Sequence, residues 1–393
     1  MAINVHNLRV YNMIVGAGSS GGEGGGGGAS SKLLIGAVGF NSYAGRTYVY
    51  DASNLATTPT ILAPSSTGDY LGALGSTSLN SVYTTLGSSG DDDLGSGAGA
   101  VYVYDSTNYS SSPTKLAPSG MISGNYMFGY STLVTSNYIA AGALRDSTAG
   151  SSAGAVYIFN TSNLAATPTR LTVTKTGNDE FFGGGLAANS TQLIVGAEMY
   201  NDMKGAVYVY DPNNLSAAPT QLTASDLAGG NRFGSEIAAT DSYIIVGAYN
   251  NDNSKGAVYV YDATNLAASP TKLVPSSAAN DDFFGSSVAI YNNMIVVGAY
   301  GDDPMGSKSG NAFVYDASNL SAAPTELYPS DGSSNDQFGY SVSVDANYVA
   351  IGANGASSNT GAVYVYDSTN LSAAPTKLTG AANDRFGSSV SLG

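Results

Sequence analysis

Residues 256–273, GAVYVYDATNLAASPTKL, decide the fold, because versions of this segment occur seven times along the chain. The acid or amide that ends the strand-like part of each copy falls at Asp51, Asp105, Asn160, Asp211, Asp262, Asp316 and Asp367. The intervals are 54, 55, 51, 51, 54 and 51 residues. A period of this length indicates an array of small units, none of which buries a core alone.

Each unit reads as four short strands. In the best-formed copy these are FGSSVAI (284–290), NMIVVGA (293–299), GNAFVYD (310–316) and a short segment at 325–328. The segments are rich in β-branched and aromatic residues, and turn residues separate them. This pattern is typical of antiparallel all-β structure.

The third strand of each unit is apolar or aromatic on both faces. In Val101-Tyr102-Val103-Tyr104 neither set of alternating side chains is polar, as one set would be if one face of the sheet met water. Small sheets that stack face to face around an axis cover both faces. We therefore predict an all-β fold, a seven-bladed β-propeller of four-stranded antiparallel blades over residues 32–393.

The two ends of the repeat array complement each other. The last unit is followed by one more first strand at 386–392, whereas the first unit begins at Leu33 without one. We expect the C-terminal strand to complete the first blade, which would remove the open edge of the ring.

Residues 1–31 lie outside the repeat and form a second predicted region, a strand-like arm followed by a Gly/Ser-rich tether. The segment either folds back onto its own propeller or docks on a partner by strand addition. For the second case, the residues expected to contact the partner are Val5, Leu8, Val10, Tyr11, Ile14 and Val15.

Composition excludes several classes of function. A net charge of −15 disfavours binding to nucleic acid. The single histidine is His6 in the arm and cysteine is absent, so we expect neither a histidine-based catalytic site nor a zinc site in the propeller, and no enzyme. The N-terminus lacks the features of a secretory signal, and the longest apolar runs are too short to span a bilayer, so no membrane insertion is expected.

Acidic residues concentrate in the loops after the second and fourth strands. These loops hold 18 of the 29 acids and seven of the basic residues, and they should emerge on one face of the ring. One interpretation is solubility and repulsion between copies. The other is weak calcium binding as the only cofactor, with Asp91, Asp92, Asp93, Asp302 and Asp303 as the candidate ligands.

The segment FGSSVAIYNNMIVVGAYGDDPMGSKSGNAFVYD (284–316) resembles the FG-GAP repeat family, which also forms the propeller heads of integrin α-subunits. The resemblance implies a seven-bladed propeller and covers residues 32–393. Family members that bind calcium carry a DxDxDG loop, and no copy here has one. The resemblance therefore implies neither a calcium site nor integrin-like function. The Phe-Gly element is found at Phe128, Phe182, Phe233, Phe284, Phe338 and Phe386, with Leu71-Gly72 as its degenerate copy. The Gly-Ala element is found at Gly36, Gly142, Gly196, Gly247, Gly298 and Gly352, and Gly87-Ser88 departs from it.

These features together favour a non-enzymatic structural or binding protein. We expect a bacteriophage virion component, such as a tail, fibre or capsid-decoration protein. The arm would attach it to other structural proteins, and the propeller would contact the host surface. The alternative is a bacterial surface or secreted adhesin that binds glycans or protein, with or without cations.

Overall fold

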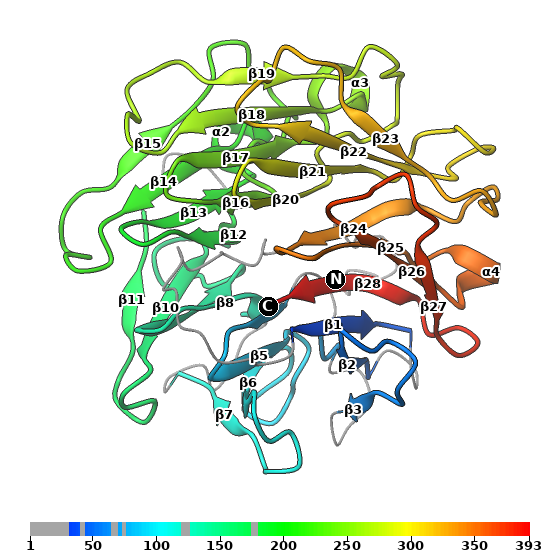
Figure 1. The fold of residues 1–393 in the computed structure, drawn as a ribbon. Helices are drawn as coiled ribbons and strands as arrows, with labels where there is room; N and C mark the ends of the chain where they lie inside the picture. The colour runs from blue at the N-terminus through cyan, green and yellow to red at the C-terminus, as the bar shows by residue number, and fades with distance from the viewer. Residues whose placement is uncertain (1–30, 40–43, 64–69, 73–75, 119–125, 174–179) are drawn as a thin grey trace.

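The computed structural model describes residues 31–39, 44–63, 70–72, 76–118, 126–173 and 180–393. Within these ranges, seven four-stranded antiparallel sheets surround a central axis as the blades of a propeller (Figure 1). The predicted fold class is confirmed. The predicted arm lies outside the described residues, apart from Ser31 at the end of its tether.

The blades follow one another along the chain, and the first strand of each is the innermost. Blade 1 joins β28 (Phe386–Leu392) to β1 (Lys32–Ala37), β2 (Arg46–Asp51) and β3 (Thr60–Leu62). Blade 2 is β4 (Thr77–Leu79), β5 (Tyr83–Ser88), β6 (Ala100–Asp105) and β7 (Thr114–Leu116). Blade 3 is β8 (Phe128–Val134), β9 (Tyr138–Ala143), β10 (Ala155–Asn160) and β11 (Thr169–Leu171). Blade 4 is β12 (Phe182–Ala188), β13 (Leu193–Ala197), β14 (Ala206–Tyr210) and β15 (Thr220–Leu222).

The remaining blades repeat this order. Blade 5 is β16 (Ile237–Ala239), β17 (Tyr243–Ala248), β18 (Ala257–Asp262) and β19 (Thr271–Leu273). Blade 6 is β20 (Ser287–Tyr291), β21 (Met294–Ala299), β22 (Asn311–Asp316) and β23 (Thr325–Leu327). Blade 7 is β24 (Phe338–Val344), β25 (Tyr348–Ala353), β26 (Ala362–Asp367) and β27 (Thr376–Thr379). Single helical turns follow the second strands of blades 4, 5 and 7, namely α2 (Tyr200–Met203), α3 (Asn251–Ser254) and α4 (Ala356–Asn359).

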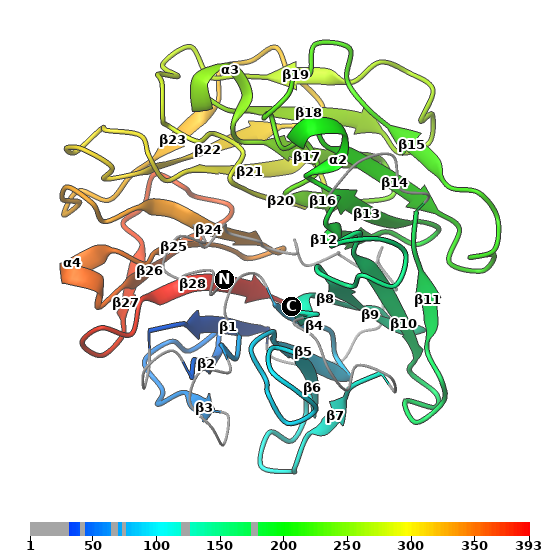
Figure 2. The ribbon, with the colours of Figure 1, turned by 180° about the vertical axis from the view of Figure 1, so that it is seen from behind.

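The C-terminal strand closes the ring as predicted. β28 pairs with β1 in antiparallel register, with Leu33 opposite Leu392 and Ile35 opposite Val390. The backbone groups of Lys32 and Gly393 extend the pairing by two further hydrogen bonds, at 2.7 and 3.2 Å. The first and last parts of the propeller therefore lie side by side in one sheet (Figures 1 and 2).

Both faces of the tyrosine-bearing strands are covered, as expected from their sequence. Tyr259 is 1% exposed and Tyr261 is 2% exposed, although both lie on the third strand of blade 5. They belong to a core cluster that also contains Val207 and Leu222 of blade 4. Comparable clusters span each of the other six seams between neighbouring blades in the described part of the chain. The core of the protein is therefore distributed between sheets rather than within any one blade.

The glycines of the repeat bring neighbouring blades into backbone contact. Gly298 is the last residue but one of β21, the second strand of blade 6, and a Cβ placed on it would lie 2.0 Å from the carbonyl oxygen of Gly339 in blade 7. The Oγ of Ser287 donates to the same oxygen at 2.9 Å. The same close approach occurs at all seven seams, in the pairs Gly36–Gly72, Gly87–Gly129, Gly142–Gly183, Gly196–Gly234, Gly247–Gly285, Gly298–Gly339 and Gly352–Gly387.

The phenylalanine of each Phe-Gly element also bonds to the preceding blade. The N–H of Phe284 donates to the carbonyl of Lys255 at 3.0 Å, and Phe284 forms an isolated bridge with Gly256. The innermost strand of blade 6 begins at Ser287, three residues later than the sequence suggested, whereas β8, β12, β24 and β28 begin at their phenylalanine. The Phe-Gly and Gly-Ala elements are thus the seam between blades.

Candidate functional site

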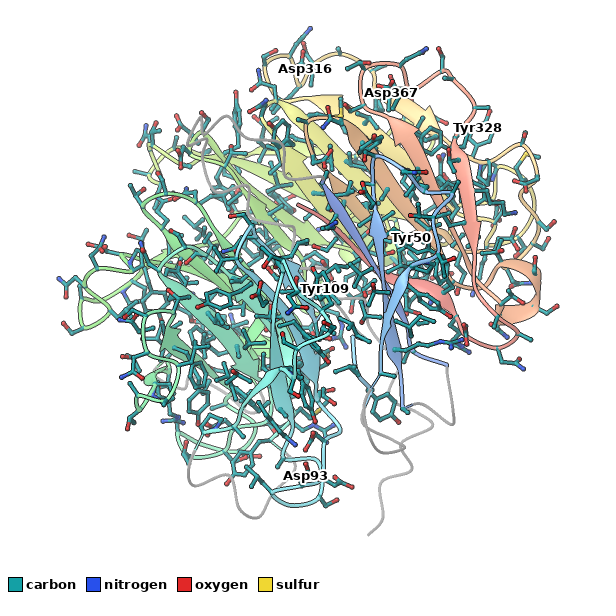
Figure 3. All side chains as sticks on the ribbon, turned by 60° about the horizontal axis from the view of Figure 1, so that its bottom comes forward. Tyr50, Asp93, Tyr109, Asp316, Tyr328 and Asp367 are labelled. Carbon is teal, nitrogen blue, oxygen red and sulfur yellow. The ribbon has the colours of Figure 1, made fainter. Side chains whose placement is uncertain are left out.

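The two faces of the ring are built differently. Phe338 pairs with Ala353 and Ala312 pairs with Leu327, so the loops after the second and fourth strands share one face, as predicted. We call this the loop face. The opposite face carries the turns after the first and third strands, and we call it the turn face. Figure 3 shows Asp316 and Asp367 of the turn face at the upper edge of the molecule and Asp93 of the loop face at the lower edge.

The turn face is a constant framework. The Oδ1 of Asp262 accepts from the N–H of Thr264 at 2.8 Å and from its hydroxyl at 2.6 Å, which fixes the turn after β18. These hydrogen bonds from Thr264 lower the pKa of Asp262. In all seven blades the backbone N–H two residues on donates to the acid or amide that ends the third strand. The recurring acid in the sequence is therefore a turn-forming residue.

The loop face carries a recurring cluster that the sequence did not reveal. In blade 5 the hydroxyl of Tyr259 donates to Asp226 at 2.9 Å, and the Nζ of Lys272 donates to the same carboxylate at 2.7 Å. The Lys272 ammonium also lies 5.6 Å from the centre of the Tyr259 ring. We call this arrangement the tyrosine–aspartate–base cluster. A charged carboxylate that accepts from both partners makes stronger hydrogen bonds than a neutral group would.

Five of the seven blades have this cluster in the described residues. The other four are Tyr48–Asp384–Arg46, Tyr102–Asp91–Lys115, Tyr157–Asp146–Arg170 and Tyr364–Asp331–Lys377. The aspartate comes from the loop after the second strand in blades 2 and 3, and from the loop before the innermost strand in blades 1, 5 and 7. The carboxylate therefore meets the same two partners, a tyrosine and a base, in each of these blades, although the aspartate that supplies it stands at different points of the repeat sequence.

The titration of the cluster follows from its burial and its partners. Burial raises the pKa of Tyr259, and its hydrogen bond to Asp226 raises it further. Burial favours the neutral form of Asp146, but the hydrogen bonds from Arg170, Thr148 and Tyr157 together outweigh it and lower the pKa of Asp146. Tyr259 therefore stays protonated and Asp146 stays charged, which suits a structural role in holding the loops.

The clusters change the charge expected for the loop face. Arg46 and the fourth-strand residues Lys115, Arg170, Lys272 and Lys377 reach this face and neutralise acids there. The seven basic residues counted from the sequence are those of the loops alone. These five lie on strands and were not included in that count. The loop face remains acidic, but its acids are partly paired.

The candidate calcium ligands are placed in two separate blades. Asp91 and Asp93 both contact the Nζ of Lys115, at 2.7 and 2.6 Å, and Asp92 accepts from the N–H of Gly97 at 2.5 Å. In blade 6, Asp302 accepts from the Nδ2 of Asn311 at 3.1 Å, and Asp303 accepts from the N–H of Lys308 at 2.5 Å.

No group of three or more His, Cys, Asp or Glu residues in the described ranges is arranged to hold a metal ion. Calcium binding stays a prediction.

Blades 4 and 6 lack the cluster in the described residues. Blade 6 has Phe313 opposite Glu326, where other blades pair a tyrosine with a base. Blade 4 has Gln221 opposite Tyr208. The ring of Tyr208 packs edge-on against Tyr200 of α2, with centroids 6.4 Å apart. The side chains at the position of the cluster therefore differ between blades, although the order of the four strands is the same in each.

A chain of aromatic and charged contacts joins the loop-face ends of blades 4 to 7. Arg232 lies 6.0 Å from the ring of Tyr249, Phe283 stacks on Tyr300 at 4.9 Å, and Tyr300 lies 5.6 Å from Tyr340. Arg232 also approaches Glu198 at 3.4 Å, and burial raises the pKa of that glutamate. These contacts therefore link four consecutive blades on the loop face.

Over the described ranges, no helix has the length and apolar character needed to cross a bilayer.

Comparison with known proteins supports the sequence resemblance. Residues 219–261, 269–315 and 324–366 match the FG-GAP repeat family. Each of the three segments begins near a fourth strand and ends within the third strand of the next blade, so it includes one complete Phe-Gly and Gly-Ala seam. No curated protein matches the chain. The chain is therefore a seven-bladed β-propeller that contains FG-GAP repeats.

Proposed function

We propose that the protein is a non-enzymatic structural or binding protein of a bacteriophage virion, a tail, fibre or capsid-associated propeller attached through residues 1–31. One observation carries the proposal. Residues 32–393 supply all four strands of all seven blades, and β28 with β1 closes the ring. No blade takes a strand from residues 1–31, and we propose that the apolar side chains of this segment bind a partner by strand addition.

The division of the ring into two faces agrees with a display role. The turn face repeats the same hydrogen-bonded turn in every blade, whereas the loop face differs from blade to blade. Binding proteins commonly place variable loops on a rigid scaffold. We assign attachment to other structural proteins to the arm and contact with a host glycan or protein to the propeller surface. The net charge of −15 argues against nucleic acid as a partner.

The experiment is the removal of residues 1–31 followed by purification of virions. The truncated protein should remain a folded monomer with the melting temperature of the full chain, and it should no longer co-purify with particles. A substitution pair gives a finer test. Val10→Asp with Ile14→Asp should abolish incorporation, and the matched control Gly25→Ser with Gly27→Ser in the tether should leave it intact.

The alternatives predict different results. If residues 1–31 pack against their own propeller, the deletion should lower the melting temperature. Incorporation of the truncated protein into virions would refute the attachment role. A bacterial surface or secreted adhesin is the second candidate. It would be found on cells rather than particles, and the loop face, which differs from blade to blade, is the observation that favours it.

A further inference from the structure

The chain joins the propeller on the turn face, at the seam between blades 7 and 1. The Oγ of Ser31 donates to Asp345 at 2.6 Å, in the turn after the first strand of blade 7. The carbonyl of Ser31 accepts from the N–H of Ala52 at 2.8 Å, in the turn after the third strand of blade 1. Both turns belong to the turn face. These hydrogen bonds therefore fix the point from which residues 1–30 leave the ring.

The predicted tether is short relative to the height of the ring. Val15, the last residue of the arm expected to contact a partner, is 16 positions from Ser31. A Gly/Ser-rich chain of this length has a root-mean-square end-to-end distance of about 22 Å. A strand of six residues, such as β2, is about 20 Å long, so most of that distance is needed to travel along one blade to the loop face. A protein that holds the arm therefore meets the turn face first.

The turn face is an ordered surface at every blade. In blade 5, Leu266 of the turn after the third strand packs against the core cluster between blades 4 and 5. The equivalent residue packs against a core cluster in each of the other six blades, at Leu55, Tyr109, Leu164, Leu215, Leu320 and Leu371. A surface that is already ordered loses little conformational freedom when a partner binds to it.

The turn face is also acidic all the way round. Its acids are Asp51, Asp105, Asp211, Asp262, Asp316 and Asp367 at the ends of third strands, and Asp241 and Asp345 after first strands. In the ranges that the structure describes, Lys32 is the only basic residue on this face. A hydrogen bond from the hydroxyl two residues on lowers the pKa of Asp316 and of Asp367, so both are charged at neutral pH.

The turn itself does not require this charge. In blade 3 the acid is replaced by Asn160, whose Oδ1 accepts from the N–H of Ser162 at 2.9 Å and from its hydroxyl at 2.7 Å. These are the two bonds that Asp262 accepts from Thr264 in blade 5. Because an amide closes the turn equally, the six carboxylates give the surface a charge that the fold does not need.

We infer that the turn face is the surface on which the attached structural protein sits, and that this protein presents basic side chains to it. The inference rests on the proposed function, because it is the arm that brings the partner to this face. It adds the orientation of the ring, with the turn face toward the assembly and the loop face away from it. Complementary charge across such a surface favours the correct partner and orientation.

The test uses single-cysteine variants of the full chain, which has no cysteine of its own. Ala374→Cys lies in the turn after the third strand of blade 7, and Ala382→Cys lies in the loop between blades 7 and 1 on the loop face. Both alanines are exposed, so a polyethylene-glycol maleimide should label the two purified variants at similar rates. In virions, labelling of Ala374→Cys should slow about tenfold, as expected when about nine-tenths of the turn faces are covered. Ala382→Cys should keep its rate.

The outcomes separate this inference from the proposed function. Absence of the wild-type chain from virions refutes the proposed function, and the inference falls with it. If the chain is present but Ala374→Cys labels at its free rate, the orientation is wrong while the attachment stands. Equal protection of Ala382→Cys overturns the orientation in the same way.

A charge variant tests the chemistry of the partner. Asp51→Asn, Asp316→Asn and Asp367→Asn together remove three charges from blades 6, 7 and 1 and keep the oxygen that closes each turn. The melting temperature should be unchanged. In competition with the wild-type chain, incorporation into virions should fall about tenfold.

The matched control removes three charges from the loop face. Asp202→Asn, Asp252→Asn and Asp281→Asn change exposed acids there and should leave incorporation unchanged. Incorporation of the turn-face variant at the level of the wild-type chain would overturn the basic partner, and so would an equal loss in the control.

Discussion

Replacement of Gly298 by alanine should loosen the seam between blades 6 and 7. A Cβ at this position would lie 2.0 Å from the carbonyl oxygen of Gly339, whereas ordinary contact begins at 3.4 Å. That carbonyl belongs to the backbone and accepts a hydrogen bond from Ser287. Both restraints hold the oxygen in place, so it cannot turn away as the end of a flexible side chain could. The two strands must separate by about 1.4 Å, the difference between these distances.

The expected cost is about 3 kcal/mol, at the upper end for an added methyl group in a packed region. Alanine also restricts the unfolded chain, which offsets the cost by about 0.5 kcal/mol. The net loss in the free energy of unfolding is then about 2.5 kcal/mol, or about 3 °C in melting temperature for a chain of this size. Urea and thermal denaturation, followed by circular dichroism, measure both quantities.

Gly229→Ala is the matched control. Its nearest neighbour would be the carbonyl oxygen of Asp202 at 3.4 Å, an ordinary contact. We expect a change of less than about 0.5 kcal/mol there. Equal stabilities for Gly298→Ala and Gly229→Ala would refute the assignment of the Gly-Ala element to the seam.

Three further changes test the loop face. Asp384→Ala should cost about 3 kcal/mol in thermal or urea unfolding, because it leaves the nearly buried Arg46 without its carboxylate, and an unchanged midpoint would contradict this ion pair. Burial, together with Asp302 and Asp303, raises the pKa of Asp282 to about 6. The protonated form is thus the one that the fold favours, so its stabilisation is complete below about pH 4 and is lost as the pH rises through 6. Asp282→Asn should therefore raise the melting temperature at pH 8 and leave it unchanged at pH 4, and the reverse would refute the assignment. Calcium at millimolar concentration should raise the melting temperature of wild type if the acidic loops bind it, and no shift would dispose of that prediction.

The repeat unit and its closure were predictable because they depend on local patterns. Apolar residues on both faces of the third strand require cover on both sides, and the extra strand at 386–392 has only one incomplete blade to join. The start of β20 was predicted too early. The same Phe-Gly element begins a strand at Phe338 and Phe386 but not at Phe284, so the element alone does not fix where the strand starts.

The tyrosine–aspartate–base cluster was not predictable in the same way. Its carboxylate comes from Asp91 in one blade and Asp226 in another, at different positions along the repeat, so no fixed spacing marks it. A weaker signal was present. The blade with Phe313 in place of the tyrosine has Glu326 in place of the base, so the two positions change together within the repeats.

The central claim, that seven blades form one closed ring, is tested most directly by hydrogen–deuterium exchange of the two terminal strands. Peptides that cover β1 should be as strongly protected as those of β17 in the middle of the chain, since each strand is paired on both sides, and β28 should match β24, the corresponding inner strand of blade 7. Exchange of β1 and β28 at the rate of the exposed turns, with β17 still protected, would show that the ring is open.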